Sequence, residues 1–221
     1  MGQGFGAFGK IPSMGDFLRL DLPVSFLSPW DDWLQRSIVS VRDKLGQGWD
    51  AAYMSARIWR FTLPPQVAGP TAVSGIMMPS VDRVGRQYPL TLACAHATSA
   101  TALVHFANCT VFEALEDIAL AALEDDFSRD NLLAALKDVT LIEPAVESLS
   151  GTPYVTALPV AEIIAAEVIS RLHGDSAFWS TCLGSDHRLM AIPGLPAGAE
   201  LTALFDLSAP FWHPGGLAVS A

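Results

Sequence analysis

The sequence predicts an α/β fold of the α+β type, a single domain in which helices flank a mainly antiparallel central sheet. Apolar or alternating stretches of strand length occur at residues 57–63, 73–77 and 90–95. Longer stretches carry apolar side chains three and four residues apart, as core-facing helices do, at residues 28–45, 101–123 and 160–172. The chain of 221 residues contains no internal repeat, linker or low-complexity tract, so we expect one domain rather than two.

The composition is that of a folded protein with a large core. Hydrophobic residues make up 51% of the chain and the mean hydropathy is +0.34. The longest unbroken apolar run, residues 118–123, is far shorter than the roughly 20 residues of a membrane span, so we expect no spanning segment. The first residues lack a secretory signal, and three cysteines, Cys94, Cys109 and Cys182, favour buried thiols over disulfides. Both observations predict a cytoplasmic protein.

The net charge of −10 is unevenly distributed along the chain. Residues 1–90 contain nine basic and seven acidic residues, whereas residues 91–221 contain four basic and sixteen acidic ones. No basic stripe is available for a phosphate backbone, so we expect no nucleic-acid partner. Four of the six tryptophans precede residue 60. A polar, tryptophan-rich first half opposite an acidic second half favours a protein that binds another protein in one orientation.

The chain begins with a predicted short strand at residues 4–11, followed by a turn at residues 12–16. The glycines of this strand have the spacing of a dinucleotide-binding loop, but no helix opens after Gly9. Lys10 is followed by Ile11 rather than by the Ser or Thr of a Walker loop. We therefore expect these glycines to allow close packing of the backbone rather than to bind a ligand.

The first helix is predicted for residues 28–45. Ser28 is suited to cap it, Pro29 to occupy its first position and Asp31 to complement its positive end. Gly46 ends it. One stripe of apolar side chains at helical spacing is expected to be buried, with Trp33 near its edge: Trp30, Leu34, Ile38, Val41 and Leu45.

A short helix at residues 49–55 and a strand at residues 57–63 are predicted next. Alternation along the strand places Trp59 on the core side and Arg60 on the other, mixed side. Two roles for Arg60 remain open. It forms a stacked or bidentate contact, or it lies on a solvated strand face.

The second half is predicted to begin with a long helix from Ser99 or Thr101 to about Leu123, with Glu116 on its polar face. His105 on this helix is interpreted as a structural residue rather than a ligand. A short helix, an irregular segment, an amphipathic helix, two strands and a final short helix or strand follow at residues 131–137, 139–157, 160–172, 177–180, 188–192 and 201–207.

The sequence lacks the motifs of the common enzyme classes. The five histidines are scattered and no Cys-x-x-Cys occurs, so no metal site is predicted. No Gly-x-Ser-x-Gly elbow is present. We therefore predict no metal, no cofactor and no catalytic residues.

A set of polar residues in the first half is the candidate site, and it is concentrated in the loop of residues 78–90. Its members are Lys10, Ser13, Asp16, Asp31, Arg60, Ser80, Asp82, Arg83 and Arg86, with Trp30, Trp33 and Trp59 as aromatic support. In one interpretation Asp16 and Asp82 pair with the arginines beneath the loops, and the tryptophans cover this structural network. In the other, part of the set faces a cleft and binds a phosphate, a carboxylate or a partner's side chain.

The second interpretation divides into two function classes. A protein-binding surface would be anchored by Arg and Trp, which often dominate interfaces. A hydrolase or phosphate-ester-binding protein would use Asp16 or Asp82 as acid and base, and Arg83 or Arg86 would hold the anion. A carboxylate beside arginines has a lowered pKa and is a weak base near neutral pH, so the sequence favours the protein-binding surface.

Four sequence blocks occur in order along the chain: GAFGKIPSMGDF at residues 6–17, PWDDWL at 29–34, WRF at 59–61, and MPSVDRVGR at 78–86 with YPL at 88–90. Together these blocks resemble the TagF (ImpM) family of type VI secretion-associated proteins. The match is dense over residues 4–92, and later only residues 178–179 and 194–196 fit the family pattern. Met14 departs from it, since Arg or Ala is common at that position.

The resemblance implies a cytoplasmic α/β domain with a motif-rich half, residues 1–92, and an acidic, helical half, residues 93–221. It implies a non-enzymatic repressor that acts after translation on type VI secretion through protein–protein interaction. The implied partner is the forkhead-associated scaffold protein Fha. A functional link to the kinase and the PP2C-like phosphatase of the pathway is also implied. Some relatives are fused to such a phosphatase, and for this chain we expect it to be a separate polypeptide.

Overall fold

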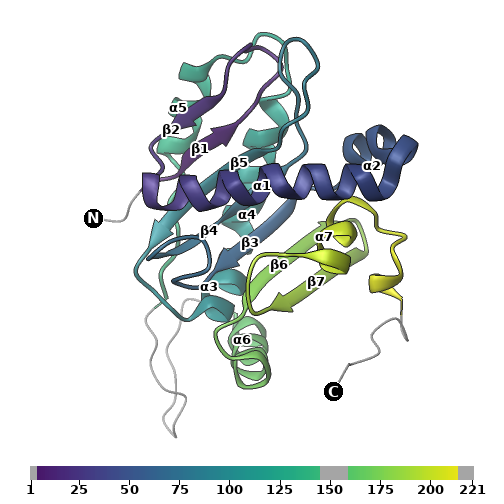
Figure 1. Ribbon diagram of the computed structural model, residues 1–221. Helices are drawn as coiled ribbons and strands as arrows, with labels where there is room; N and C mark the ends of the chain where they lie inside the picture. Colours follow the sequence, from purple (N-terminus) through teal and green to yellow (C-terminus); the bar gives the residue numbers. More distant parts are fainter. Residues whose placement is uncertain (1–3, 145–158, 214–221) are drawn as a thin grey trace, which may run out of the picture.

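A seven-stranded sheet forms the centre of the molecule, of which the computed structural model describes residues 4–144 and 159–213. The strands are β1 (Gly6–Gly9), β2 (Leu18–Leu20), β3 (Trp59–Leu63), β4 (Ala72–Met78), β5 (Leu90–His96), β6 (Ala177–Leu183) and β7 (Asp186–Ile192). They lie in the order β2-β1-β5-β4-β3-β6-β7 (Figure 1). All neighbouring strands are antiparallel, which confirms the predicted α/β class with an antiparallel sheet.

Helices cover both faces of this sheet (Figure 1). They are α1 (Val24–Leu45), the 3-10 helix η1 (Gly46–Gly48), α2 (Trp49–Ser55), α3 (Thr101–Ala107), α4 (Cys109–Ala121), α5 (Arg129–Lys137), α6 (Val160–His173), α7 (Gly198–Phe205) and the 3-10 helix η2 (Pro210–Trp212). One face packs against α1, which crosses the strands, and against α2 and α7. The other face packs against α3, α4, α5 and α6.

Aromatic side chains fill the layer between α1 and the sheet. The ring of Trp30 lies 4.8 Å from that of Phe61 and 6.1 Å from that of Trp179, centroid to centroid. Trp33, predicted near the edge of the apolar stripe, is only 7% exposed and belongs to this core. Most indole N–H groups in protein cores are paired with an acceptor. Trp30 donates to Thr91 Oγ1, Trp33 to the carbonyl of Pro196 and Trp59 to the carbonyl of Leu204, at 2.8–3.0 Å.

Strand β3 sends its side chains alternately to the two faces, as predicted. Trp59 lies in the α1 layer, whereas Arg60 faces α4. Arg60 is 8% exposed, and its Nε and Nη2 donate to both carboxylate oxygens of Glu116 at 2.7 and 2.9 Å. The bidentate interpretation of Arg60 is confirmed and the solvated one is wrong. The prediction that Glu116 lies on the polar face of its helix, away from the core, is also wrong. Its side chain points toward the sheet, where its carboxylate neutralises the guanidinium of Arg60.

Helix α1 begins at Val24, one turn before the predicted start at Ser28. Phe26 is buried against Trp30, with ring centroids 5.3 Å apart, so apolar packing extends the helix toward its N-terminus. Pro29 consequently lies inside the helix rather than at its first position. The predicted end is confirmed, since Gly46 follows α1 with φ of 53°.

The long helix predicted for residues 101–123 is two helices that meet at Asn108. The side chain of Asn108 is buried and donates to the carbonyls of Val104 and Ile142, both at 2.8 Å. Its amide oxygen accepts the N–H of Ile142, also at 2.8 Å. Such side-chain bonds compete with the helical backbone pattern, so the helix ends and restarts here. The N-cap of α3 is Ala100 rather than the predicted Ser99 or Thr101.

Most of the other predicted elements are confirmed. The helices predicted at residues 49–55, 131–137 and 160–172 are α2, α5 and α6, and residues 201–207 fall largely in helix α7. The predicted strands at residues 177–180 and 188–192 are the longer strands β6 and β7, which form a hairpin. Residues 139–144 contain no helix or strand, and the rest of the predicted irregular segment, 145–157, lies outside the described residues.

The cysteines differ from the predicted set of buried thiols. Cys94 is buried, Cys109 is half-buried and Cys182 is exposed. Cys182 lies next to the last residue of β6, near the turn of the β6–β7 hairpin. Among the described residues, no helix combines the length and the apolar character that crossing a bilayer requires.

Candidate functional site

The candidate site consists of the loop of residues 79–89, between β4 and β5, and the turn that follows β1 (Figure 1). Strand β1 pairs with β5, with Phe8 opposite Thr91, so the chain leaves β1 at Lys10 beside this loop. The approach is close, since a Cβ on Gly9 would lie 2.0 Å from the carbonyl oxygen of Pro89. Gly9 also has φ of 132°, a conformation that favours glycine. The predicted role of the N-terminal glycines in close backbone packing is therefore confirmed here.

Asp82 lies at the centre of the loop and is 2% exposed. Its Oδ1 accepts the backbone N–H groups of Val84 and Arg86, at 3.1 and 2.9 Å. Its Oδ2 accepts the Nε–H of Arg86 at 2.6 Å and lies 3.0 Å from the Nζ of Lys10. A charge is retained in such a buried position only when it is paired and hydrogen-bonded. Asp82 therefore ties the loop to itself and to the end of β1.

These contacts hold the pKa of Asp82 well below its ordinary value. Burial by itself would raise this pKa because it disfavours the charged form. Hydrogen bonds from the backbone of Arg86, from Lys10, from the Arg86 guanidinium and from the backbone of Val84 outweigh burial. The carboxylate therefore stays ionised near neutral pH and is unsuited to act as a general base there.

Helix α2 holds the loop from the other side. The Tyr53 hydroxyl donates to the carbonyl of Ser80 at 2.8 Å and accepts the N–H of Ser80 at 3.1 Å. The indole of Trp49 donates to Oε1 of Gln87 at 2.6 Å. Burial raises the pKa of Tyr53 far above its ordinary value, so its hydroxyl remains a donor. The loop is thus fixed between β1 and α2 and has a defined conformation.

Five side chains of the loop and the neighbouring turn are exposed, and we call them the loop surface: Asp16, Phe17, Arg83, Val84 and Arg86. The backbone N–H of Arg83 donates to the carbonyl of Met14 at 3.0 Å, so the loop and the turn lie side by side. Phe17 and Val84 are 42% and 70% exposed. In the described parts of the chain, the guanidinium of Arg83 has no hydrogen-bond or ion-pair partner. The surface therefore combines an exposed cation with apolar side chains on a fixed backbone.

The remaining members of the predicted polar set lie apart from Asp82. Ser13 donates to the carbonyl of Phe127 at 2.6 Å, and Arg60 is bound to Glu116 beneath α4. Asp31 accepts the hydroxyl of Tyr88 at the far end of the loop. Asp16 is exposed, and the structure, over the residues it describes, brings it into no ion pair with an arginine.

The three predicted support tryptophans do not cover this network. They donate their N–H groups to residues outside the polar set, and they belong to the core under α1. The tryptophan that does contact the loop is Trp49, which the sequence reasoning missed together with Tyr53 and Gln87. Trp49 and Tyr53 are four residues apart on a short helix and therefore share one face of it, which is the pattern that could have indicated their common role.

The geometry separates a bonded carboxylate from an exposed cation. The buried carboxylate of Asp82 is fully bonded, whereas the cation of Arg83 is exposed and unpaired in the described structure. Within the described residues, no group of three or more His, Cys, Asp or Glu side chains is placed to hold a metal ion. An exposed arginine beside apolar side chains is suited to bind a carboxylate or another anionic group of a partner.

Comparisons with known proteins agree with this architecture. Residues 6–139 match the model of a family described as the TagF N-terminal domain, type VI secretion system-associated. The crystal structure of PA0076 from Pseudomonas aeruginosa PAO1 is similar, with a TM-score of 0.77 and 30% sequence identity. The similarity covers 93% of this chain and 95% of that one. A search of curated proteins found no match.

Proposed function

Because this chain belongs to the TagF family of type VI secretion-associated proteins, we propose that it is a cytoplasmic regulator that restrains type VI secretion by binding a protein. The proposed partner is the forkhead-associated scaffold protein Fha of that pathway. The proposed contact is the loop surface. In this proposal the chain breaks no bond itself, and the kinase and phosphatase of the pathway are separate proteins.

The observation that carries the proposal is the guanidinium of Arg83, which is unpaired among the described residues and lies on a loop that Asp82 fixes from beneath. A loop that is already ordered loses little conformational entropy on binding, so more of the contact energy appears as affinity. Arginine is among the residues that most often dominate interfaces, especially when apolar neighbours exclude water around it. Phe17 and Val84 are exposed apolar side chains of the same surface.

The charge distribution supports an acidic contact on the partner. The first 90 residues are slightly basic, whereas the remainder of the chain is strongly acidic. An acidic patch on Fha would therefore be attracted to the loop surface and repelled by the second half, which selects one orientation. Because Arg83 and Arg86 are exposed, added salt should weaken the complex.

The alternative function is that of a phosphate-ester-binding protein or hydrolase, in which Asp16 or Asp82 acts with Arg83 and Arg86. The burial and lowered pKa of Asp82 weigh against it as the acid or base. Thermal-shift measurements with nucleotides and phosphorylated peptides distinguish the two functions. If the protein has a small-molecule site, the bound ligand raises Tm, and the rise grows with the logarithm of the ligand concentration above Kd. If the loop surface binds only a protein, these small ligands should leave Tm unchanged.

The test of the proposal is recovery of Fha from cells that carry the secretion cluster, with the tagged wild type as bait. Arg83→Ala is the test variant. Arg171→Ala is the matched control, since Arg171 is exposed on α6 at the opposite end of the sheet (Figure 1). We expect the wild type and Arg171→Ala to recover Fha and Arg83→Ala to lose it. Equal recovery by all three proteins, or no Fha with the wild type, would contradict the proposal.

A further inference from the structure

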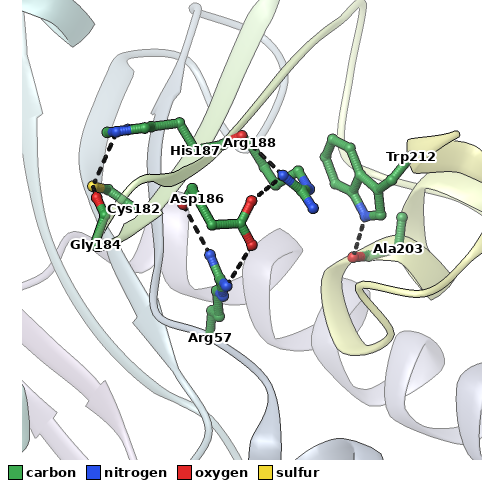
Figure 2. Close-up of polar contacts among 8 residues, drawn as sticks. All are labelled: Arg57, Cys182, Gly184, Asp186, His187, Arg188, Ala203 and Trp212. Carbon is green, nitrogen blue, oxygen red and sulfur yellow. Dashed lines mark hydrogen bonds and ion pairs between the residues drawn. The ribbon is translucent and has the colours of Figure 1, made fainter. Parts of the chain in front are cut away.

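The β6–β7 hairpin carries a cysteine–histidine pair far from the loop surface in the sequence. Cys182 and His187 are directly opposite each other in the register of the hairpin. The Sγ of Cys182 lies 3.8 Å from Nε2 of His187 and 3.7 Å from the carbonyl oxygen of Gly184 (Figure 2). Cys182 and His187 are both exposed. The hairpin thus places a potential nucleophile within hydrogen-bonding reach of a potential base.

A separate charged cluster lies on the other side of strand β7 (Figure 2). There the carboxylate of Asp186 accepts from Arg57 at 2.7 Å and from Arg188, and the Arg188 guanidinium lies over the ring of Trp212. Consecutive residues of a strand point to opposite sides, so His187 points away from this cluster. Arg57 and Arg188 share the one carboxylate of Asp186, whereas the imidazole of His187 lies beside Cys182.

The pair borders a cavity of 310 Å³ between the hairpin and helices α3 and α4. Other residues that line it are Arg60, His105, Cys109 and Ser180. Arg60 is fixed by Glu116, and His105 bonds to Ser180 at 2.8 Å, so the floor of the cavity is held in place. Its volume is in the range of protein cavities that bind small molecules, about 300–1,000 Å³.

The three thiols of the chain differ in their suitability for reaction. Burial raises the pKa of Cys94 to about 12. Burial also raises the pKa of Cys109, with the charge of Glu162 contributing in the same direction. The thiolate is the nucleophile, so both of these thiols are poorly reactive. Cys182 is exposed and lies beside His187, which makes the other two cysteines internal controls.

We propose that Cys182, with His187 as its base, is a site of reversible S-thiolation by small disulfides of the glutathione class. In the reaction, the Cys182 thiol transfers its proton to Nε2 of His187, and the thiolate attacks one sulfur of the disulfide. A new S–S bond forms between Cys182 and that sulfur while the original S–S bond breaks. The departing thiolate takes the proton from His187, and attack by a small thiol reverses the step. The cavity accommodates the peptide part of the bound group.

The experiment treats the full-length protein with glutathione disulfide at pH 7 and follows the modified sites by mass spectrometry over time. We expect one glutathionyl group on Cys182 in the wild type, little on Cys94 or Cys109, and removal of the group by reduced glutathione. Cys182→Ser should remain unmodified under the same conditions. His187→Gln should slow the reaction at least tenfold, with an unchanged Tm because both residues are exposed.

The dependence of the rate on pH separates a base from a merely structural histidine. At pH 10 thiols ionise without a base, so the wild type and His187→Gln should react equally fast there. The other titratable and charged groups around the pair, which both proteins retain, are Asp186, Arg188, Arg60, Glu113, Glu116, His105, Glu162 and Cys109. Equal rates for the two proteins at pH 7, or faster modification of Cys94 or Cys109 than of Cys182, would overturn the proposal.

Discussion

The Nζ of Lys10 lies 3.0 Å from Oδ2 of Asp82, and the two side chains are 8% and 0% exposed. This ion pair joins the end of β1 to the loop between β4 and β5, two segments that are distant in the sequence. Arg86 binds the same carboxylate oxygen from the solvent side, with its side chain 63% exposed. One buried carboxylate thus fixes the loop between an internal cation and a surface cation.

Asp82→Asn keeps the size of this side chain and removes its charge, so we expect a lower Tm and faster amide hydrogen exchange over residues 80–87. The lowered pKa also has a consequence for pH. The unfolded chain binds a proton at Asp82 near pH 4, whereas the folded chain does so only at lower pH, so this residue stabilises the fold above about pH 4. That contribution is lost as the pH falls further.

Denaturant unfolding at pH 7, 5 and 3.5 checks this expectation. The wild type should lose more stability between pH 5 and pH 3.5 than Asp82→Asn does. Asp16→Asn is the control, since Asp16 is exposed on the same surface, and its pH dependence should match that of the wild type. A wild type and an Asp82→Asn variant with parallel acid profiles would refute the role given to Asp82.

Glu116→Gln should destabilise the fold by about 3 kcal/mol, because it leaves the guanidinium of Arg60 buried without its carboxylate. The matched control is Glu113→Gln, which removes an exposed charge from the same helix and should change the free energy of unfolding by less than about 0.5 kcal/mol. Urea denaturation of both variants measures the difference. Equal stabilities would mean that the Arg60–Glu116 pair contributes little to the fold.

Gly9→Ala should prevent the loop from closing onto β1. The added Cβ would lie 2.0 Å from the carbonyl oxygen of Pro89, and the backbone conformation there is one that favours glycine. We expect a loss of about 3 kcal/mol or failure to fold. Gly48→Ala is the control, since its Cβ would meet no described atom within 4 Å and its φ is −80°. Thermal unfolding of the two variants, in which Gly48→Ala should match or exceed the wild type, tests this difference.

His105 should make the protein less stable as the pH falls below about 6.5. Burial, assisted by the charge of Arg60, lowers the pKa of His105 to about 3. The unfolded chain therefore binds a proton at this residue between pH 6.5 and 3 while the folded chain does not. Stability is lost in that range by up to about 1.4 kcal/mol per pH unit.

His105→Gln retains polar atoms that can bond Thr62 and Ser180 but does not titrate. Its free energy of unfolding should therefore depend less on pH between 6.5 and 5 than that of the wild type. His173→Gln, at the exposed end of α6, should retain the wild-type dependence. Both slopes are read from urea unfolding curves, and identical slopes for the wild type and His105→Gln would exclude this role.

Sequence periodicity predicted most of the helices and strands. A helix or strand that buries one face has apolar residues at a regular spacing, and that spacing can be read from neighbouring residues of the chain. Trp59 and Arg60 illustrate this, since alternation alone assigned them to opposite faces of β3. The partner of Arg60 was not predictable in this way. Arg60 and Glu116 are far apart in the sequence, and they meet only because α4 packs against the sheet.

The contacts within the candidate site could be predicted only in part, because they join segments that are distant in the sequence. Lys10, Asp82 and Arg86 stood out as opposite charges beside turn residues, and the pairing of β1 with β5 brings them together. Asp16, of the same residue type as Asp82, remains on the surface. Composition does not distinguish these two aspartates, because only the fold decides which of them receives the backbone N–H groups of the loop.

The most direct test of the central claim is the affinity of purified Fha for the wild type and for Arg83→Ala, measured by isothermal titration calorimetry at low salt. We expect at least tenfold weaker binding by Arg83→Ala, about 1.4 kcal/mol, with a Tm equal to that of the wild type. Equal affinities for the two proteins would show that the loop surface is not the contact with Fha.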